Sequence, residues 1–211
     1  MSSWRVALEQ LLDTAYAGLE REEIGWAVVG SAASALQGCA IVPDDLDVLL
    51  CEAEGVTRFA QLMDTYAPRT CVVEPGEEGW VSSRQQPVSV GPDKYGFVWH
   101  FGRWYVDGFK LEAAHIVPPE EFALSADGAG VWDVGPEIWP HIRHVPFAGY
   151  QVPVVPLEIQ LQTCLRRGLE ARAEAIAALL HARGAERELL KVSLSPEHLA
   201  WFDRAFADES R

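Results

Sequence analysis

The sequence has no long uninterrupted run of apolar residues and no closely spaced cysteine pair. None of its apolar runs approaches the roughly 18 residues that a membrane-crossing helix needs. Its first residues are charged and amphipathic instead of signal-like, so we expect a cytoplasmic protein with no membrane segment. The 4 cysteines are widely separated and form no CxxC pair. This spacing argues against a disulfide scaffold and against a zinc ribbon.

Basic residues are scarce, with 17 Lys and Arg against 31 Asp and Glu and a formal net charge of −14. Binding of DNA or RNA needs clustered cations that displace counterions from phosphates. The densest basic stretch, Arg166-Arg167 with Arg172, is too small for a duplex footprint. We interpret these arginines as a solvated helix face, from which one could still reach a bound phosphate. The charge therefore favours a small-molecule or protein partner over duplex nucleic acid.

The length of 211 residues and the hydrophobic content of 49% are sufficient for a compact domain with a core. Apolar periodicity predicts strands at residues 26–29, 44–50 and 69–74, and helices at 3–19, 32–37, 55–66, 119–124, 156–180, 186–192 and after Ser195. Aromatic and β-branched residues predict a hairpin over 97–116 with its turn at Gly102-Arg103, and a second hairpin over 144–155 around Gly149. Residues 75–94 look like a long loop or an irregular hairpin. The fold class predicted from this order is α+β (α/β).

The stretch at residues 26–50 contains the main functional signals. Gly30-Ser31 lies where a strand turns into a small-residue helix, so backbone N–H groups and a hydroxyl could face an anion such as a phosphate. Asp45 and Asp47 are two positions apart on the next strand, so their side chains emerge on one face. Adjacent carboxylates repel each other unless a cation joins them. Together these features predict a metal and nucleotide site.

Each feature also has an ordinary structural interpretation. Gly30-Ser31 could be a strand-to-helix turn with a serine cap, because serine is favoured there. The aspartates could form a solvated turn, and we assign that role to Asp44 in either case. The compatible positions of the two signals favour the metal and nucleotide site.

Gly30-Ser31, then Gly38, then Asp45-Leu46-Asp47 at the head of an apolar strand resemble the nucleotidyltransferase fold. This is the polymerase-β-like superfamily, which includes small antibiotic-modifying and toxin-like nucleotidyltransferases of bacteria. The resemblance implies a mixed β-sheet flanked by helices, with a nucleotidyltransferase-like core at 1–117. It also implies that a hairpin and helical extension at 118–211 complete the cleft.

The resemblance further implies transfer of a nucleoside monophosphate from an NTP, such as ATP, to a hydroxyl acceptor. One or two Mg²⁺ ions would be held by Asp45, Asp47 and a third carboxylate, and Gly30 and Ser31 would bind the phosphates. Glu112 is our choice for the third carboxylate, with Asp107 as the second choice. The acceptor expected from the charge is a small molecule, and a protein or a tRNA end is the alternative. A different class of function, a catalytically inactive binding or antitoxin-like module, also remains open.

Several other residues have a functional and a structural interpretation. Glu112 could be an exposed carboxylate on the wet face of a strand. We interpret His141 and His144 as surface histidines, because they lie three apart in a proline-rich segment. The indole rings of Trp80, Trp99 and Trp104 could stack on an acceptor or a base, although core packing is the expectation for the last two.

Overall fold

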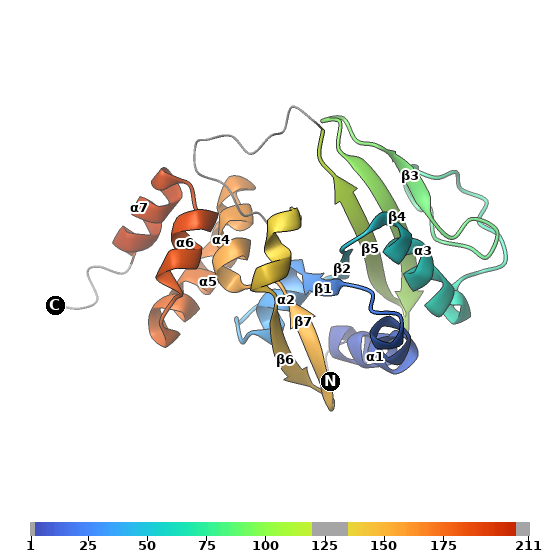
Figure 1. Ribbon diagram of the computed structural model, residues 1–211, viewed down its shortest axis with the longest axis horizontal. Coiled ribbons are helices and arrows are strands. Elements are labelled where there is room, and N and C mark those ends of the chain that lie inside the picture. The colour runs from blue at the N-terminus through green and yellow to red at the C-terminus, as the bar shows by residue number, and fades with distance from the viewer. Residues whose placement is uncertain (1–2, 120–134, 206–211) are drawn as a thin grey trace.

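The computed structural model describes residues 3–119 and 135–205 of the chain (Figure 1). The strands are β1 (Trp26–Val29), β2 (Leu46–Leu50), β3 (Ser89–Pro92), β4 (Val98–Val106), β5 (Phe109–Val117), β6 (Arg143–Phe147) and β7 (Tyr150–Val154). The α-helices are α1 (Ser3–Arg21), α2 (Gly30–Leu36), α3 (Ala53–Leu62), α4 (Leu157–Arg166), α5 (Glu170–Arg183), α6 (Arg187–Ser193) and α7 (Pro196–Ala205). Two 3₁₀ helices, η1 (Asp64–Tyr66) and η3 (Pro136–His141), complete the described elements.

The strands form one mixed sheet of 7 strands in the order β3-β4-β5-β2-β1-β7-β6. The pairs β2–β5 and β1–β7 are parallel, and the other neighbouring pairs are antiparallel. The predicted α+β class with a mixed sheet is thus confirmed. The hairpin formed by β6 and β7 extends the same sheet beyond β1, so residues after 142 contribute two of its strands.

Helices cover the two faces of the sheet unequally. On one face, α1 and α3 pack against β2, β4 and β5 around a core that includes Leu8, Val48, Phe59, Trp104 and Leu111. On the other face, a smaller cluster packs η3, α4 and α6 against β1 and β2. The helices α4 to α7 gather at the opposite end of the molecule from β3 and β4 (Figure 1). Strands β4 and β5 on the second face lie outside this smaller cluster.

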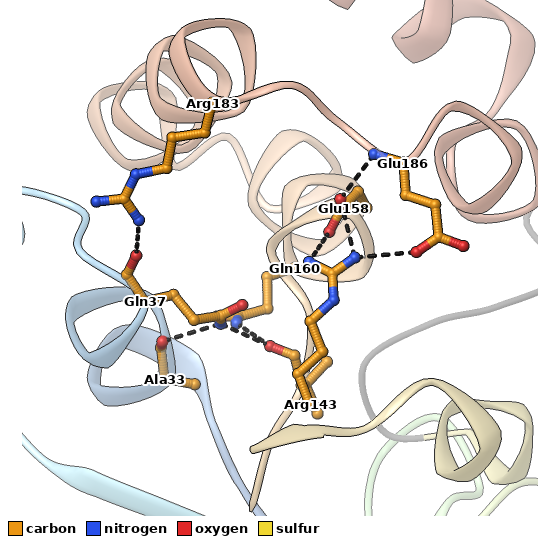
Figure 2. Close-up of polar contacts among 8 residues, drawn as sticks. Ala33, Gln37, Arg143, Glu158, Gln160, Arg183 and Glu186 are labelled. Atoms are coloured by element: carbon orange, nitrogen blue, oxygen red, sulfur yellow. Dashed lines mark hydrogen bonds and ion pairs between the residues drawn. The ribbon is translucent and has the colours of Figure 1, made fainter. Parts of the chain in front are cut away.

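A buried ion-pair network ties the C-terminal helices to the β6–β7 hairpin (Figure 2). The Glu158 side chain is 2% exposed, and its two carboxylate oxygens accept hydrogen bonds of 2.9 and 3.1 Å from Arg143. The backbone N–H of Glu186 donates a further bond to Glu158, and Arg143 also pairs with the Glu186 carboxylate. The network therefore joins β6, α4 and the start of α6 in one arrangement.

Three boundaries in the C-terminal region follow the sequence prediction. The helix predicted to break near Gly168 is divided there into α4 and α5, with Gly168 at φ +65°. The predicted cap is present, since the Ser195 hydroxyl accepts a hydrogen bond from the His198 backbone N–H. The hairpin predicted around Gly149 is the β6–β7 pair.

The predicted turn at Gly102-Arg103 is wrong. Strand β4 runs through both residues to Val106, and the chain reverses at Asp107-Gly108. Both turn residues have positive φ, 50° and 76°, which is typical of a two-residue hairpin with the Asp-Gly sequence. The correct turn moves the register of the hairpin and decides which side chains face Glu112.

The strand predicted at residues 69–74 is also wrong. These residues form no strand, and Val72 is 96% exposed because nothing packs against it. Within the predicted loop at 75–94, the chain forms the short edge strand β3 instead. The helix predicted at 119–124 lies outside the described residues apart from its first position.

The described cysteines are Cys39, Cys51, Cys71 and Cys164, and all are free, as their spacing predicts. Among the described residues, none of the helices combines the length and apolar character that spanning a bilayer requires.

Candidate metal and nucleotide site

Three carboxylates meet where β2 begins beside the middle of β5. Asp47 pairs with Glu112 in the parallel β2–β5 register, so both side chains lie on the same face of the sheet. Asp45 lies two residues before Asp47, immediately ahead of the strand. One oxygen from each of the three carboxylates lies within 4.8 Å of the other two. The structure thus brings together the three residues that the sequence analysis selected for a metal.

Gly30, in the strand-to-helix turn, lies beside Asp47 of this cluster. Its φ of +64° lies in the left-handed region that favours glycine, and a Cβ atom at this position would lie 2.9 Å from Oδ2 of Asp47. Glycine therefore allows the backbone to approach the carboxylate. Ser31, the next residue, is 4% exposed within α2.

Two cations lie against the carboxylates. The Lys110 ammonium is 2.9 Å from Oδ2 of Asp45 and 3.5 Å from Oε1 of Glu112. The Arg103 Nε donates a 2.7 Å hydrogen bond to the same Glu112 oxygen, and its Nη1 bonds to the backbone oxygen of Trp80. The two cations reduce the repulsion among the three carboxylates.

Asp47 is the most perturbed acid of the cluster. Its pKa is raised from 3.8 to about 7, first by burial and then by the negative charges of Asp45 and Glu112. The positive charges of Lys110 and Arg167 act in the opposite direction. An additional positive charge would therefore stabilise the ionised form of Asp47, which has two acidic neighbours.

The remaining predicted residues are placed as follows. Asp107 is exposed in the β4–β5 turn and does not join the cluster, and Asp44 is exposed ahead of β2. Of the C-terminal arginines, Arg167 is close enough for its charge to act on Asp47. His141 and His144 belong to none of the metal-type clusters found among the described residues.

Among the tryptophans, Trp104 lies in the core, as expected, and Trp80 is buried outside that cluster. Trp99 is partly exposed, so the expectation that it packs in the core is wrong. It sits on the wet face of β4 and borders a cavity.

Sequence analysis missed Lys110 and Arg103. Both lie on the Glu112 face of the hairpin, Lys110 two residues before Glu112 and Arg103 opposite it. The misplaced turn put Arg103 in a loop, which removed it from this face. The Asp107-Gly108 dipeptide is the signal that would place Arg103 correctly, whereas alternation along the strand already puts Lys110 on the Glu112 face.

The donor set suits a magnesium ion. Carboxylate oxygens are ligands that Mg²⁺ prefers, and oxygens bound to one such ion lie about 3–4 Å apart. The three oxygens lie within 4.8 Å of one another, and small side-chain rotations would bring them to this spacing. The charges of Asp45 and Glu112, which raise the pKa of Asp47, would be offset by such an ion.

No protein-family pattern and no curated protein matches the sequence. Among solved structures, the chain is similar to TM1012 of Thermotoga maritima, described as a candidate nucleotidyltransferase. The identity is 23% and the TM-score 0.54, with 83% of this chain and 91% of the other covered.

Two structures of the antibiotic-resistance factor ANT(2'')-Ia also match. Its solution structure has 14% identity and a TM-score of 0.44, with 100% of this chain and 95% of the other covered. Its complex with adenylyl-2''-tobramycin has 13% identity and a TM-score of 0.47, with 94% and 98% covered. These two similarities are too low to carry an argument. On the sheet topology and the similarity to TM1012, the chain has the α+β nucleotidyltransferase fold.

Proposed function

We propose that the protein is a Mg²⁺-dependent nucleotidyltransferase that moves a nucleoside monophosphate from an NTP to the hydroxyl group of a small molecule. The observation that carries this proposal is the convergence of Asp45, Asp47 and Glu112 beside the Gly30 turn. The similarity in fold supports the reaction class and says nothing about the acceptor.

In the reaction, the acceptor oxygen forms a bond to the α-phosphorus while the bond from that phosphorus to pyrophosphate breaks. Asp45 and Asp47 would hold Mg²⁺, which would neutralise charge on the phosphates. Glu112 would be the third metal ligand or would accept the proton of the acceptor hydroxyl. Backbone N–H groups at Gly30 and Ser31 would orient the triphosphate. Arg167, which follows α4, would add positive charge to the site, and its charge already acts to lower the pKa of Asp47.

We assign residues 1–117 to the nucleotidyltransferase core and 118–211 to the second wall of the cleft. Two features support this division. The β6–β7 hairpin joins the sheet beside β1, and α4 leads from it to Arg167 near the carboxylates. The nucleotide would then lie between the Gly30 turn and the end of α4.

A small acceptor is favoured by charge. The net charge of −14 repels polyanions such as tRNA, whereas a neutral or cationic small molecule meets no such barrier. Transfer to a protein remains the enzymatic alternative.

The test is release of pyrophosphate by the full-length protein from each of the four NTPs, with Mg²⁺ and a library of hydroxyl compounds. We expect release that depends on one acceptor class, and that is lost in the double variant Asp45→Ala, Asp47→Ala. The control is the double variant Glu22→Ala, Glu23→Ala, at two exposed acids outside the cluster. Equal release by the double variant and the wild type would refute the proposal.

A non-catalytic module with the same fold is the second candidate. The ion pairs that Lys110 and Arg103 make with the carboxylates favour it, because they offset negative charge that a metal would otherwise meet. A thermal unfolding scan separates the two candidates. Binding of MgATP raises the melting temperature only if the folded protein binds it, so no shift with any NTP would support the inert module.

A further inference from the structure

A cavity of about 350 Å³ lies on the same face of the sheet as the three carboxylates. It lies over β3 and β4, and Gly76, Glu77 and Trp80 also line it. Its lining includes the rings of Trp80, Trp99 and Phe101, the backbone of Gly91, and the Arg103 side chain. This volume suits a ligand of one or two rings.

The rings are held in place before any ligand binds. The Trp99 indole N–H donates a 3.2 Å hydrogen bond to Asp93, whose other oxygen accepts bonds from the backbone of the β3–β4 turn. The Phe101 ring lies between two partners, with its centroid 6.0 Å from that of Trp80 and 5.2 Å from the Arg103 guanidinium carbon. Fixed rings lose little conformational entropy when a ligand stacks on them.

Arg103 connects this cavity to the candidate metal site. It lines the cavity and donates a hydrogen bond to Glu112 across the β4–β5 pair. Phe101 is two residues from Arg103 on β4, so its side chain leaves the strand about 7 Å further from the carboxylates.

The sheet order places the cavity on the acceptor side of the site. Across the sheet from β1 to β4, the order is the Gly30 turn after β1, Asp47 on β2, Glu112 on β5 and Arg103 on β4. The aromatic rings of Phe101 and Trp99 follow along β4. In phosphoryl transfer the attacking and leaving oxygens lie on opposite sides of the phosphorus. With the triphosphate at the Gly30 turn, the attacking hydroxyl comes from the direction of the cavity.

We propose that this cavity is the acceptor subsite and that it takes a compound in which a flat aromatic ring carries the hydroxyl group. Stacking of that ring on Trp99 would anchor the acceptor, and its hydroxyl would be directed along β4, past Arg103, toward Glu112. The assignment rests on the proposed function, because the cavity is an acceptor subsite only if the carboxylates act on an NTP.

Gly91 offers a variant that blocks the cavity without disturbing the rings. It lies on β3 opposite Trp99, and a Cβ atom there would meet no atom within 4 Å. Gly91→Leu should therefore fold and fill the cavity. Val90, which is 60% exposed and faces the other side of β3, gives the matched control Val90→Leu.

The experiment measures three ligands on each full-length variant. N-acetyl-L-tyrosinamide is the aromatic probe, with methyl glucoside as the saturated-ring comparison, and binding is followed by saturation-transfer NMR. MgATP binding is followed by calorimetry. We expect the wild type and Val90→Leu to bind the aromatic probe in preference to the glucoside, and Gly91→Leu to bind it about tenfold or more weakly, as expected for lost stacking. All three proteins should bind MgATP equally.

Two results would overturn the subsite while leaving the proposed function intact. In the first, Gly91→Leu binds MgATP and also binds the aromatic probe as tightly as the wild type does. In the second, the wild type binds the glucoside in preference to the aromatic probe. Failure of the wild type to bind MgATP would instead refute the proposed function, and the acceptor assignment with it. If Gly91→Leu unfolds, Trp99→Leu replaces it, and its affinity for the aromatic probe is expected to fall to the same extent.

Discussion

Asp47 on β2 and Glu112 on β5 are direct neighbours in a parallel strand pair, although 64 positions separate them in the sequence. The register directs both carboxylates to one face, and Asp45 joins them from the residue ahead of the strand. Acidic side chains at paired positions of two neighbouring strands repel each other and lower the stability unless positive charge is nearby. Lys110 and Arg103 supply that charge here, and in the proposed function Mg²⁺ would do so.

The pH dependence of stability should carry the signature of Asp47. Its pKa is raised from 3.8 to about 7, mainly by burial, so the folded protein keeps a proton that the unfolded chain releases. The stability contributed by this proton is fully present below the unfolded-state pKa and is lost as the pH rises to about 7. Stability of the metal-free protein should therefore fall across this interval.

The variant Asp47→Asn removes this contribution, because an amide does not titrate. In urea unfolding with a chelator present, we expect wild type to lose about 1–3 kcal/mol more than the variant as the pH is raised from 5 to 8. Parallel pH profiles for the two proteins would show that Asp47 does not titrate in this range.

Lys110→Met should separate a metal site from a structural ion-pair cluster. Its ammonium lies against Asp45 and Glu112, so its loss leaves the carboxylates with less positive charge. We expect a lower melting temperature without metal and a larger stabilisation by Mg²⁺ than in the wild type, by about 1 kcal/mol. Lys94→Met, at an exposed lysine above the Tyr95 ring, is the control. A destabilised variant that Mg²⁺ fails to rescue would support the inert module.

Gly30→Ala should impair nucleotide binding more than its cost in stability explains. The substitution forces a side chain into φ +64° and toward Oδ2 of Asp47. A left-handed non-glycine residue costs about 1–2 kcal/mol. Gly149→Ala is the matched control, since Gly149 has φ +88° with no atom within 4 Å of an added Cβ. Both should lower stability, but only Gly30→Ala should weaken MgATP binding in calorimetry, and equal affinities would contradict the proposed role of the turn.

Arg143→Ala should test how the C-terminal helices are attached. The change leaves the buried Glu158 carboxylate without its charged partner (Figure 2). Glu158 is buried whereas Arg143 is 39% exposed, so the loss should be about 1–3 kcal/mol, which urea unfolding would measure. Arg187→Ala is the control, because the Arg187–Asp203 pair is exposed and should contribute little. A similar loss in both variants would contradict the importance of the buried network.

Local sequence patterns predict the elements that depend on near neighbours. Strand β1 was predicted at its observed bounds because residues 26–29 are uniformly apolar and end at glycine. Alternation along a strand predicts that Asp45 and Asp47 share a face, whereas Glu112 was chosen because the family resemblance implies a third carboxylate on a neighbouring strand.

The parts that failed depend on turn chemistry or on distant partners. Gly102 was taken for a turn residue, whereas the strand needs a small residue there because the Trp104 ring packs against it. Residues 69–74 have strand-like composition, but no neighbouring strand is available to pair with them. The position of Arg103 opposite Glu112 follows only once Asp107-Gly108 is accepted as the turn.

Calorimetric titration of the full-length protein with MgATP and the other magnesium NTPs tests the central claim most directly. We expect the wild type to bind at least one of them, and expect chelation of Mg²⁺ to abolish that binding. The double variant Asp45→Ala, Asp47→Ala should fold and show no binding under the same conditions. Unchanged affinity in the double variant would contradict the claim that these carboxylates hold the metal and its nucleotide.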